Sequence, residues 1–215
     1  MTQLSDAQRG QRLPRAARRA QLLDAARSVF VAAGYHAAAM DDIADRAGVS
    51  KPVLYQHFPG KLDLYLALLD HSCDQLEQLV RDALARPSEG NKGRVEATVE
   101  AYFDFVSAQD SGFRMVFESD LTNDPQVRNR IDGIGLTCAE AIADVIAADT
   151  GISDDQAMLL GVALTGLAQV SARYWLAQGQ DVPKDEASRL VSRLAWGGIG
   201  SVPVLERETS GPAGR

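Results

Sequence analysis

The chain has 215 residues, of which 46% are hydrophobic and 24% are charged, so it is long and apolar enough for one or two globular domains and is not a disordered chain. Its net charge of −7, taken over the whole chain, argues against a nucleic-acid-binding protein. No apolar run has the length of a signal peptide or a membrane span, and the two cysteines form no CxxC motif, so we expect a soluble, reduced, cytoplasmic protein with no membrane partner.

The positive charges are concentrated near the N-terminus. Residues 1–61 contain nine basic and five acidic residues, a net charge of +4, whereas the remainder contains 13 basic and 24 acidic residues, a net charge of −11. A basic segment on an acidic body is typical of a small DNA-binding domain attached to a domain that does not bind DNA. The alternative is that the N-terminal arginines form only a solvated tail.

The N-terminal region predicts a flexible arm followed by a helix. Residues 1–13 are polar and lack helical periodicity, whereas a helix is predicted from Pro14 to Gly34. Arg15, Arg18 and Arg19 lie near the start of this helix, where the helix dipole disfavours positive charge. Contact with DNA phosphates would explain their position.

The segment from residue 40 to residue 65 predicts two short helices joined by a tight turn. Ile43, Ala44 and Ala47 form the apolar face of the first helix. Gly48 follows it and can adopt the left-handed conformation that ends a helix.

The second short helix begins near Ser50, a preferred N-cap residue, and carries Pro52 in its first turn. Leu54 and Phe58, four residues apart, form its inward face. The remaining side chains point elsewhere: Lys51, Val53, Tyr55, Gln56 and His57. This arrangement predicts a helix-turn-helix, whose second helix enters the major groove of DNA. A helical hairpin with no partner is the alternative interpretation.

The rest of the chain predicts further helices and no strand. Helical periodicity runs from residue 61 to about residue 86, from 95 to 106, from 125 to 151, from 153 to 179 and from 183 to 197. The predicted domains are residues 14–60 and 61–205, with a disordered tail at 206–215. Because the last two helices are apolar on more than one face, they are either buried or paired with a second copy, and we predict a homodimer.

The helix-turn-helix region resembles the TetR family of bacterial transcription regulators. The matching residues are Leu22 to Gly34-Tyr35, Asp42-Ile43-Ala44, Ala47-Gly48-Val49-Ser50, Leu54-Tyr55, His57-Phe58, Lys61 and Leu64. The resemblance implies an all-α fold of about nine helices, with an N-terminal three-helix DNA-binding domain and a larger ligand-binding and dimerisation domain. One departure is visible, because many relatives have a threonine cap on the second helix where this chain has Ala39-Met40.

The second domain resembles, within that family, the actinobacterial regulators of fatty-acid synthesis. The matching segments are AYFDFV at 101–106, FRMVFESDL at 113–121, ARYWL at 172–176 and AWGGIGSVP at 195–203. This resemblance implies a long-chain acyl-CoA effector and control of the genes of fatty-acid synthesis.

The resemblance also assigns roles in DNA binding. Lys51, Pro52, Val53 and Tyr55 are expected to face base edges of a palindromic double-stranded operator, and Gln56, His57 and Lys61 to hold phosphates, with Ser50 at the start of the same tip. Chemistry agrees, since lysine can donate to guanine N7 or O6 and valine can pack on a thymine methyl group. The alternatives are packing for Tyr55 and a surface or core-lining position for His57.

An apolar effector would need an apolar channel with cations at its mouth. The aromatic candidates for the channel are Tyr102, Phe103, Phe105, Phe113, Phe117 and Trp175, and the cationic candidates are Arg114, Arg128 and Arg173. The alternative is that the aromatic residues are ordinary core residues. We expect no cofactor and no metal site.

Catalysis is not predicted, because the chain has no GxSxG, HExxH, GxGxxG or P-loop spacing. Two other functions are compatible with the sequence: a TetR-type repressor of an efflux or catabolic gene with a different hydrophobic effector, and a helical lipid carrier or dimerisation protein without DNA binding. The sequence does not distinguish an activator from a repressor, and it does not name the operator.

Overall fold

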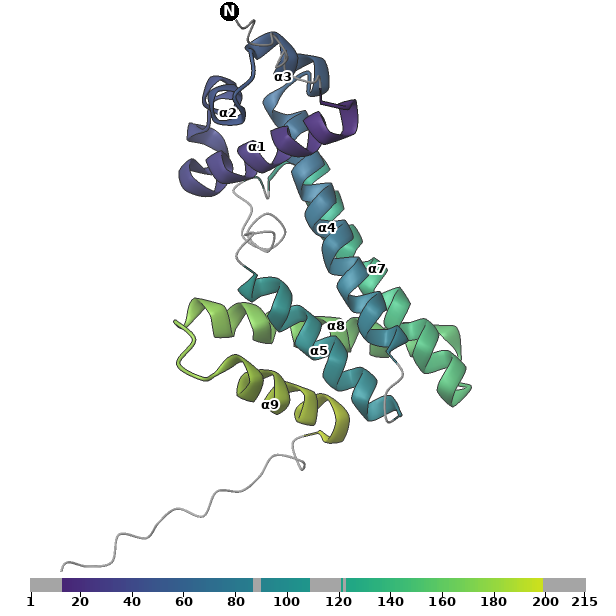
Figure 1. Ribbon diagram of the computed structural model, residues 1–215. Helices are drawn as coiled ribbons and strands as arrows, with labels where there is room; N and C mark the ends of the chain where they lie inside the picture. The colour runs from purple at the N-terminus through teal and green to yellow at the C-terminus, as the bar shows by residue number, and fades with distance from the viewer. Residues whose placement is uncertain (1–12, 87–89, 109–120, 122, 199–215) are drawn as a thin grey trace, which may run out of the picture. The chain divides into compact units, whose positions relative to one another are not determined.

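The computed structural model describes residues 13–86, 90–108, 121 and 123–198. Within these residues the secondary structure is α-helical with no β-strand, which confirms the predicted all-α class (Figure 1). The described helices are α1 (Arg15–Ala37), α2 (Met40–Ala47), α3 (Lys51–His57), α4 (Lys61–Ala85), α5 (Asn91–Ser107), α7 (Pro125–Thr150), α8 (Asp154–Ala177) and α9 (Lys184–Gly197). None of them is long and apolar enough to cross a lipid bilayer.

The chain divides into two compact units, one formed by Met1–Cys73 and Asp110–Ile131 and the other by Asp74–Gln109 and Asp132–Arg215. The first division therefore falls within α4, whereas the sequence suggested a boundary between residues 60 and 61, and another division falls within α7, after Ile131. The first division lies within α4 because the first turns of this helix pack on α1: the Tyr65 ring lies 5.4 Å from that of Phe30 and 5.2 Å from that of Tyr35. The predicted arm and the predicted tail at 206–215 lie outside the described residues, apart from Leu13.

The core of the first unit is formed by one apolar face from each of α1, α2, α3 and α4. Its fully buried side chains are Leu22, Ile43, Leu54, Phe58, Leu64, Leu68 and Leu69. The helix α1 is interrupted at Gly34, where φ is 74° and ψ is 166°, so the predicted break is confirmed. Because an L-residue rarely adopts a positive φ, this position favours glycine.

The second unit is a helical bundle in which α5, α8 and α9 pack on one another (Figure 1). Tyr102, Phe103 and Val106 of α5 are fully buried in its core, and Cys138 of α7 is buried as well. The helices α7 and α8 approach closely at Gly161, where a Cβ atom would lie 2.3 Å from the carbonyl oxygen of Ala139. Only glycine allows this contact between the two helix backbones.

Candidate nucleic-acid interface

The turn between α2 and α3 is set by backbone geometry. Gly48 adopts the left-handed conformation (φ 64°, ψ 36°), and the N–H of Val49 donates to the carbonyl of Ala44 over 3.0 Å. These features end α2 as predicted. From α1, the side-chain amide of Gln21 donates to the carbonyl of Ala47 over 2.8 Å, a contact that the sequence pattern did not reveal.

The N-caps of α2 and α3 form no side-chain hydrogen bond. Ser50 occupies the N-cap of α3 with extended backbone angles, yet its hydroxyl makes no capping hydrogen bond, so the predicted cap is wrong in this respect. An N-cap side chain normally meets the N–H of the second or third helical residue, and Pro52, the second residue of α3, has none. At the N-cap of α2, Ala39 likewise provides no side-chain hydrogen bond.

The helix α3 is anchored on one side and exposed on the other. Leu54 is fully buried and Phe58, its C-cap, is 2% exposed, which confirms the predicted inward face. The residues predicted to contact DNA lie together on the other side: Ser50, Lys51, Pro52, Tyr55 and Gln56 are exposed, and Val53 and His57 are half-buried. The structure therefore brings these seven predicted residues to one short surface.

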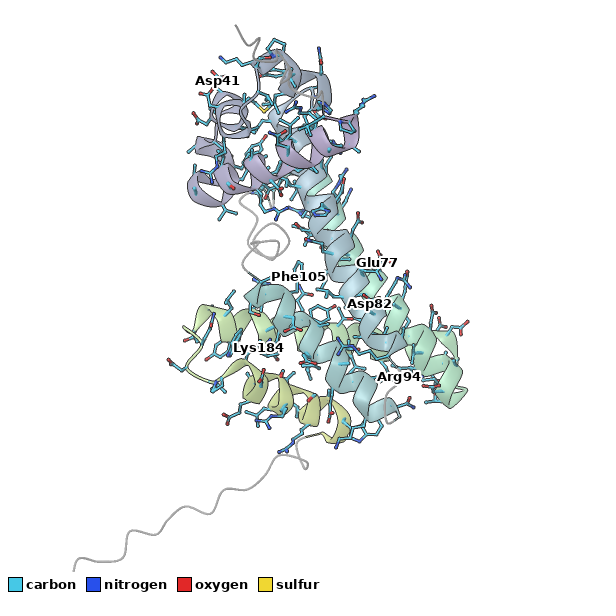
Figure 2. The ribbon with its side chains drawn as sticks, in the orientation of Figure 1. Asp41, Glu77, Asp82, Arg94, Phe105 and Lys184 are labelled. Carbon is cyan, nitrogen blue, oxygen red and sulfur yellow. The ribbon has the colours of Figure 1, made fainter. Side chains whose placement is uncertain are left out.

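An ion pair links this surface to α2. The Nζ atom of Lys51 lies 2.6 Å from Oδ2 of Asp41, and both side chains are exposed; Figure 2 labels Asp41. The hydrogen bond with this carboxylate raises the pKa of Lys51 above its ordinary value. Sequence reasoning missed Asp41, because the two residues are ten positions apart and on different helices.

Lys61, the first residue of α4, contacts the backbone at the end of α1. Its Nζ atom donates to the carbonyl oxygens of Tyr35 (2.8 Å), Ala38 (2.9 Å) and His36 (3.3 Å) and lies 4.6 Å from the centre of the Tyr35 ring. An ammonium group has three hydrogens to donate, and these three carbonyls occupy them at the end of α1, where the helix dipole favours a cation. Lys61 therefore forms a structural contact between α4 and α1, and its predicted phosphate contact stays a prediction.

The N-terminal arginines are partly engaged within the unit. Arg18 donates to the Gln21 side chain over 2.8 Å, and the guanidinium of Arg19 lies 4.5 Å from the centre of the Phe58 ring. A cation over an aromatic face is stabilising, so Arg19 ties α1 to the end of α3. Arg15 is exposed.

The described members of the predicted effector set come from the core and the surface of the helices. Tyr102, Phe103, Phe105 and Trp175 are buried, with the rings of Phe103 and Trp175 5.4 Å apart and the Trp175 indole donating to the carbonyl of Val182 over 2.6 Å. These aromatic side chains form core contacts, and their role in effector binding stays a prediction. Arg128 and Arg173 are exposed. Phe113, Arg114 and Phe117 lie outside the described residues.

The second unit has a pocket of about 400 Å³ elsewhere, a size within the range of small-molecule sites. None of the predicted effector residues that the structure describes lines it. Its walls are mainly Leu84, Val95, Val99, Ile142, Val145, Ile146, Leu160, Leu164, Ala168 and Trp196. Sequence reasoning missed it because these residues come from five helices, each with an ordinary apolar face.

A few polar groups interrupt the apolar lining of this pocket. Arg94, labelled in Figure 2, donates to Asp149 over 2.6 Å and to Asn91 over 3.0 Å, and all three residues line the pocket. The Nε of Arg94 and the hydroxyl of Thr98 are buried without a hydrogen-bond partner among the described residues. Buried polar groups are nearly always hydrogen-bonded in native proteins, so these two atoms are available to a ligand or water.

A further polar cluster lies in the same unit. The Tyr102 hydroxyl is near the Cys138 thiol and the Thr165 hydroxyl, although neither hydroxyl reaches hydrogen-bond geometry. Burial raises the pKa of the Tyr102 hydroxyl well above its ordinary value and that of the Cys138 thiol to about 11. Cys138 is therefore a neutral thiol at physiological pH, which suits a packing role and not a reactive one.

The first unit is a compact helical head in which α3 is exposed on one side, and the second unit is helical and contains a pocket. This combination is typical of the class of helix-turn-helix regulators. The family model described as "Bacterial regulatory proteins, tetR family" matches residues 22–68. The HTH-type transcriptional activator FasR of Mycolicibacterium smegmatis is 48% identical over 196 residues, which cover 91% of this chain and 89% of that protein. The chain therefore belongs to the TetR family of transcriptional regulators. This membership favours a transcriptional regulator over the alternative of a helical carrier without DNA binding.

Other relatives agree with this assignment. The HTH-type transcriptional regulator SrpR of Pseudomonas putida is 38% identical over 43% of this chain and 41% of its own length. A TetR-like transcriptional regulator from Rhodococcus sp. RHA1 has the same fold, with a TM-score of 0.66 and 26% identity over 88% of this chain and 99% of that chain. The regulator FadR from Bacillus subtilis, solved in complex with stearoyl-CoA, also has a TM-score of 0.66, with 18% identity over 84% of this chain and 98% of that one.

Proposed function

We propose that this TetR-family regulator binds a palindromic operator as a homodimer, activates genes of fatty-acid synthesis and responds to a long-chain acyl-CoA. The observation that carries the proposal is the 48% identity to an activator over 91% of the chain. The chromosome of a bacterium lies in the cytoplasm, and the protein acts there.

The exposed side of α3 is the proposed DNA-reading surface. Lys51 and Tyr55 are exposed and Val53 is half-buried on this helix, so their side chains are available to base edges in a major groove. Gln56 and His57, the next two residues after Tyr55, are the proposed contacts to phosphate oxygens.

The dimer is supported by an apolar stripe along α8. Leu159, Val162, Val170 and Tyr174 are 46–70% exposed and recur at helical spacing on one face, with Gly166 between them. On α9, Leu190 and Trp196 are also exposed. An exposed apolar stripe such as that on α8 is typical of an interaction site, and a second copy of the same helix would bury it around a two-fold axis.

The pocket of the second unit is the proposed effector site. Its apolar walls suit a hydrocarbon chain, and the Thr98 hydroxyl and the Arg94 guanidinium are polar groups that can meet a carbonyl or an anionic head. A protein of the same fold was solved with stearoyl-CoA bound, which supports an acyl thioester as the ligand class.

The proposed mechanism is a population shift. The helix α4 contributes Lys61–Cys73 to the first unit and Asp74–Ala85 to the second. The helix α7 likewise begins in the first unit and continues into the second after Ile131. These two helices are the continuous elements through which the effector site can influence the DNA-binding unit. An effector shifts the equilibrium between binding-competent and incompetent dimers only by its difference in affinity for the two.

The test is selection of bound duplexes from genomic DNA by the full-length protein, followed by measurement of the operator affinity by fluorescence anisotropy with and without palmitoyl-CoA. Recovery of palindromic sites near fatty-acid-synthesis genes, and an affinity that changes with the thioester, are the expected results. An unchanged affinity would disprove the acyl-CoA effector alone. Failure to select any duplex, or a monomer in sedimentation at binding concentrations, would disprove the proposed DNA-binding mode.

A further inference from the structure

Asp41 and Lys51 form the ion pair on the proposed reading surface. Asp41 lies in the first turn of α2 and Lys51 is the first residue of α3. The Nζ–Oδ2 distance is 2.6 Å, and the side chains are 60% exposed for Lys51 and 54% exposed for Asp41. The pair therefore sits where the turn presents α3 to solvent.

This ion pair contributes little to the stability of the fold. Exposed ion pairs contribute little to folding, because water screens them and both side chains lose freedom. The head is instead held by its buried apolar residues and by the backbone contacts of Lys61 and Gln21. The main effect of the ion pair is to reduce the positive charge that α3 presents to a ligand.

A carboxylate beside a lysine changes which DNA acceptors the lysine can approach at low cost. An unpaired ammonium is attracted to any phosphate and adds to sequence-independent affinity. When the Lys51 ammonium is paired with Asp41, its approach to a phosphate also brings the negative charge of Asp41 close to the DNA backbone. Guanine N7 and O6 are neutral acceptors in the centre of the major groove. The Asp41 carboxylate therefore disfavours a contact of Lys51 with a base edge less than a contact of Lys51 with a phosphate.

We infer that Asp41 is a specificity-determining residue, which holds the Lys51 ammonium and lowers affinity for non-operator DNA more than affinity for the operator. This inference rests on the proposed reading role of α3. It assigns a function to a residue on the first helix of the motif, outside the set that faces DNA by resemblance.

The experiment compares full-length wild-type protein with Asp41→Asn on the operator and on a scrambled duplex of equal length and composition. We expect the variant to bind the scrambled duplex about fivefold more tightly, roughly what one unit charge about 4 Å from a phosphate contributes in water. Operator affinity should change less, so the ratio of the two affinities falls. The slope of log K against log salt on the scrambled duplex should steepen by about 0.9, the contribution of one added phosphate contact.

Asp42→Asn is the matched control. It removes the same charge from the same first turn of α2, and within the described residues Asp42 forms no ion pair with Lys51. A Lys51→Met background provides the second control, since the effect of Asp41→Asn on the affinity ratio should vanish there. Asp41→Ser repeats the test with a different side chain.

Equal affinity ratios for Asp41→Asn, Asp42→Asn and wild type would overturn the inference, as would an effect that persists without Lys51. In both cases salt-dependent binding of the wild-type protein to its operator would leave the proposed function intact. A wild-type protein that binds neither duplex would overturn the proposed function and this inference together.

Discussion

The two units of this protein treat their polar groups differently. In the described part of the first unit, no buried side-chain polar atom lacks a partner, whereas in the second unit Arg94, Thr98, Tyr102 and Thr165 each have one such atom. Unpaired buried groups destabilise a fold unless water or a ligand completes them. The buried polar atoms in the described part of the first unit thus need no ligand, and its proposed binding surface is on the outside. The unpaired polar atoms of the second unit could instead bind a polar group in its interior.

The largest effect tests how tightly the second unit is packed. Gly161→Ala places a Cβ atom 2.3 Å from a backbone carbonyl, so α7 and α8 must separate and the free energy of unfolding should fall by about 2–3 kcal/mol. Urea denaturation followed by circular dichroism measures this change.

Gly135→Ala is the matched control, because it lies on α7, the other helix of this contact, and outside the proposed dimer stripe of α8. A Cβ there meets no atom within 4 Å, and alanine favours helix by up to about 1 kcal/mol, so stability should not decrease. Equal destabilisation by both substitutions would show that the close contact between α7 and α8 does not limit packing.

The next effect tests the surface of the head. Tyr55 is 47% exposed, so Tyr55→Ala should leave the fold intact while operator affinity falls about ten- to a hundredfold, the usual range for a lost specific contact. Anisotropy titration measures the affinity, and sedimentation confirms that dimers persist. Unchanged operator affinity at physiological salt would assign Tyr55 to packing alone.

Lys61→Met distinguishes a structural contact from a phosphate contact. Three backbone carbonyls lose their donor, so the head should lose about 1–2 kcal/mol of stability, and operator affinity should fall with it. The salt slope of DNA binding should stay constant. A slope that decreases by about 0.9 would support the phosphate contact predicted for this residue.

Thr98→Val removes an unpaired hydroxyl from the pocket of the second unit while keeping its shape. Because that hydroxyl is buried without a partner among the described residues, the unfolding free energy should rise, by about 1 kcal/mol. The response of operator affinity to palmitoyl-CoA should weaken. Lower stability combined with an intact response would mean that the hydroxyl is already satisfied in the free protein.

The smallest effect concerns the ion pair between α5 and α9, in which Lys184 donates to Asp104 over 2.5 Å. Figure 2 labels Lys184. The hydrogen bond raises the pKa of Lys184 above its ordinary value. The stabilisation is therefore complete below the ordinary lysine pKa of about 10.4 and is lost as pH rises through the folded-state value. Because both side chains are more than a third exposed, the loss should be below about 1 kcal/mol.

Thermal unfolding of wild type and Lys184→Met between pH 8 and pH 11 measures this effect. The two proteins should differ at pH 8 and converge toward pH 11. A difference that does not depend on pH would show that Lys184 acts through the packing of its methylene chain.

Patterns within single helices determined much of this protein. The left-handed Gly48, the paired Leu54 and Phe58, and the break at Gly34 follow from conformational preference and helical spacing over a few residues. For the same reason the long helix predicted to end near residue 86 ends at Ala85, and the exposed set on α3 was found by elimination of its inward face.

Only the tertiary structure decided which hydrogen-bond or ion-pair partner each of these polar side chains has. Lys61 meets carbonyls 23–26 residues away, Lys51 meets Asp41 of another helix, and Arg94 meets Asp149, 55 positions along the chain. The pocket likewise depends on five helices at once. Helical periodicity is a short-range property of the chain, whereas ion pairs and cavities depend on which helix faces meet, and amphipathic faces that are alike in sequence can pack against different partners.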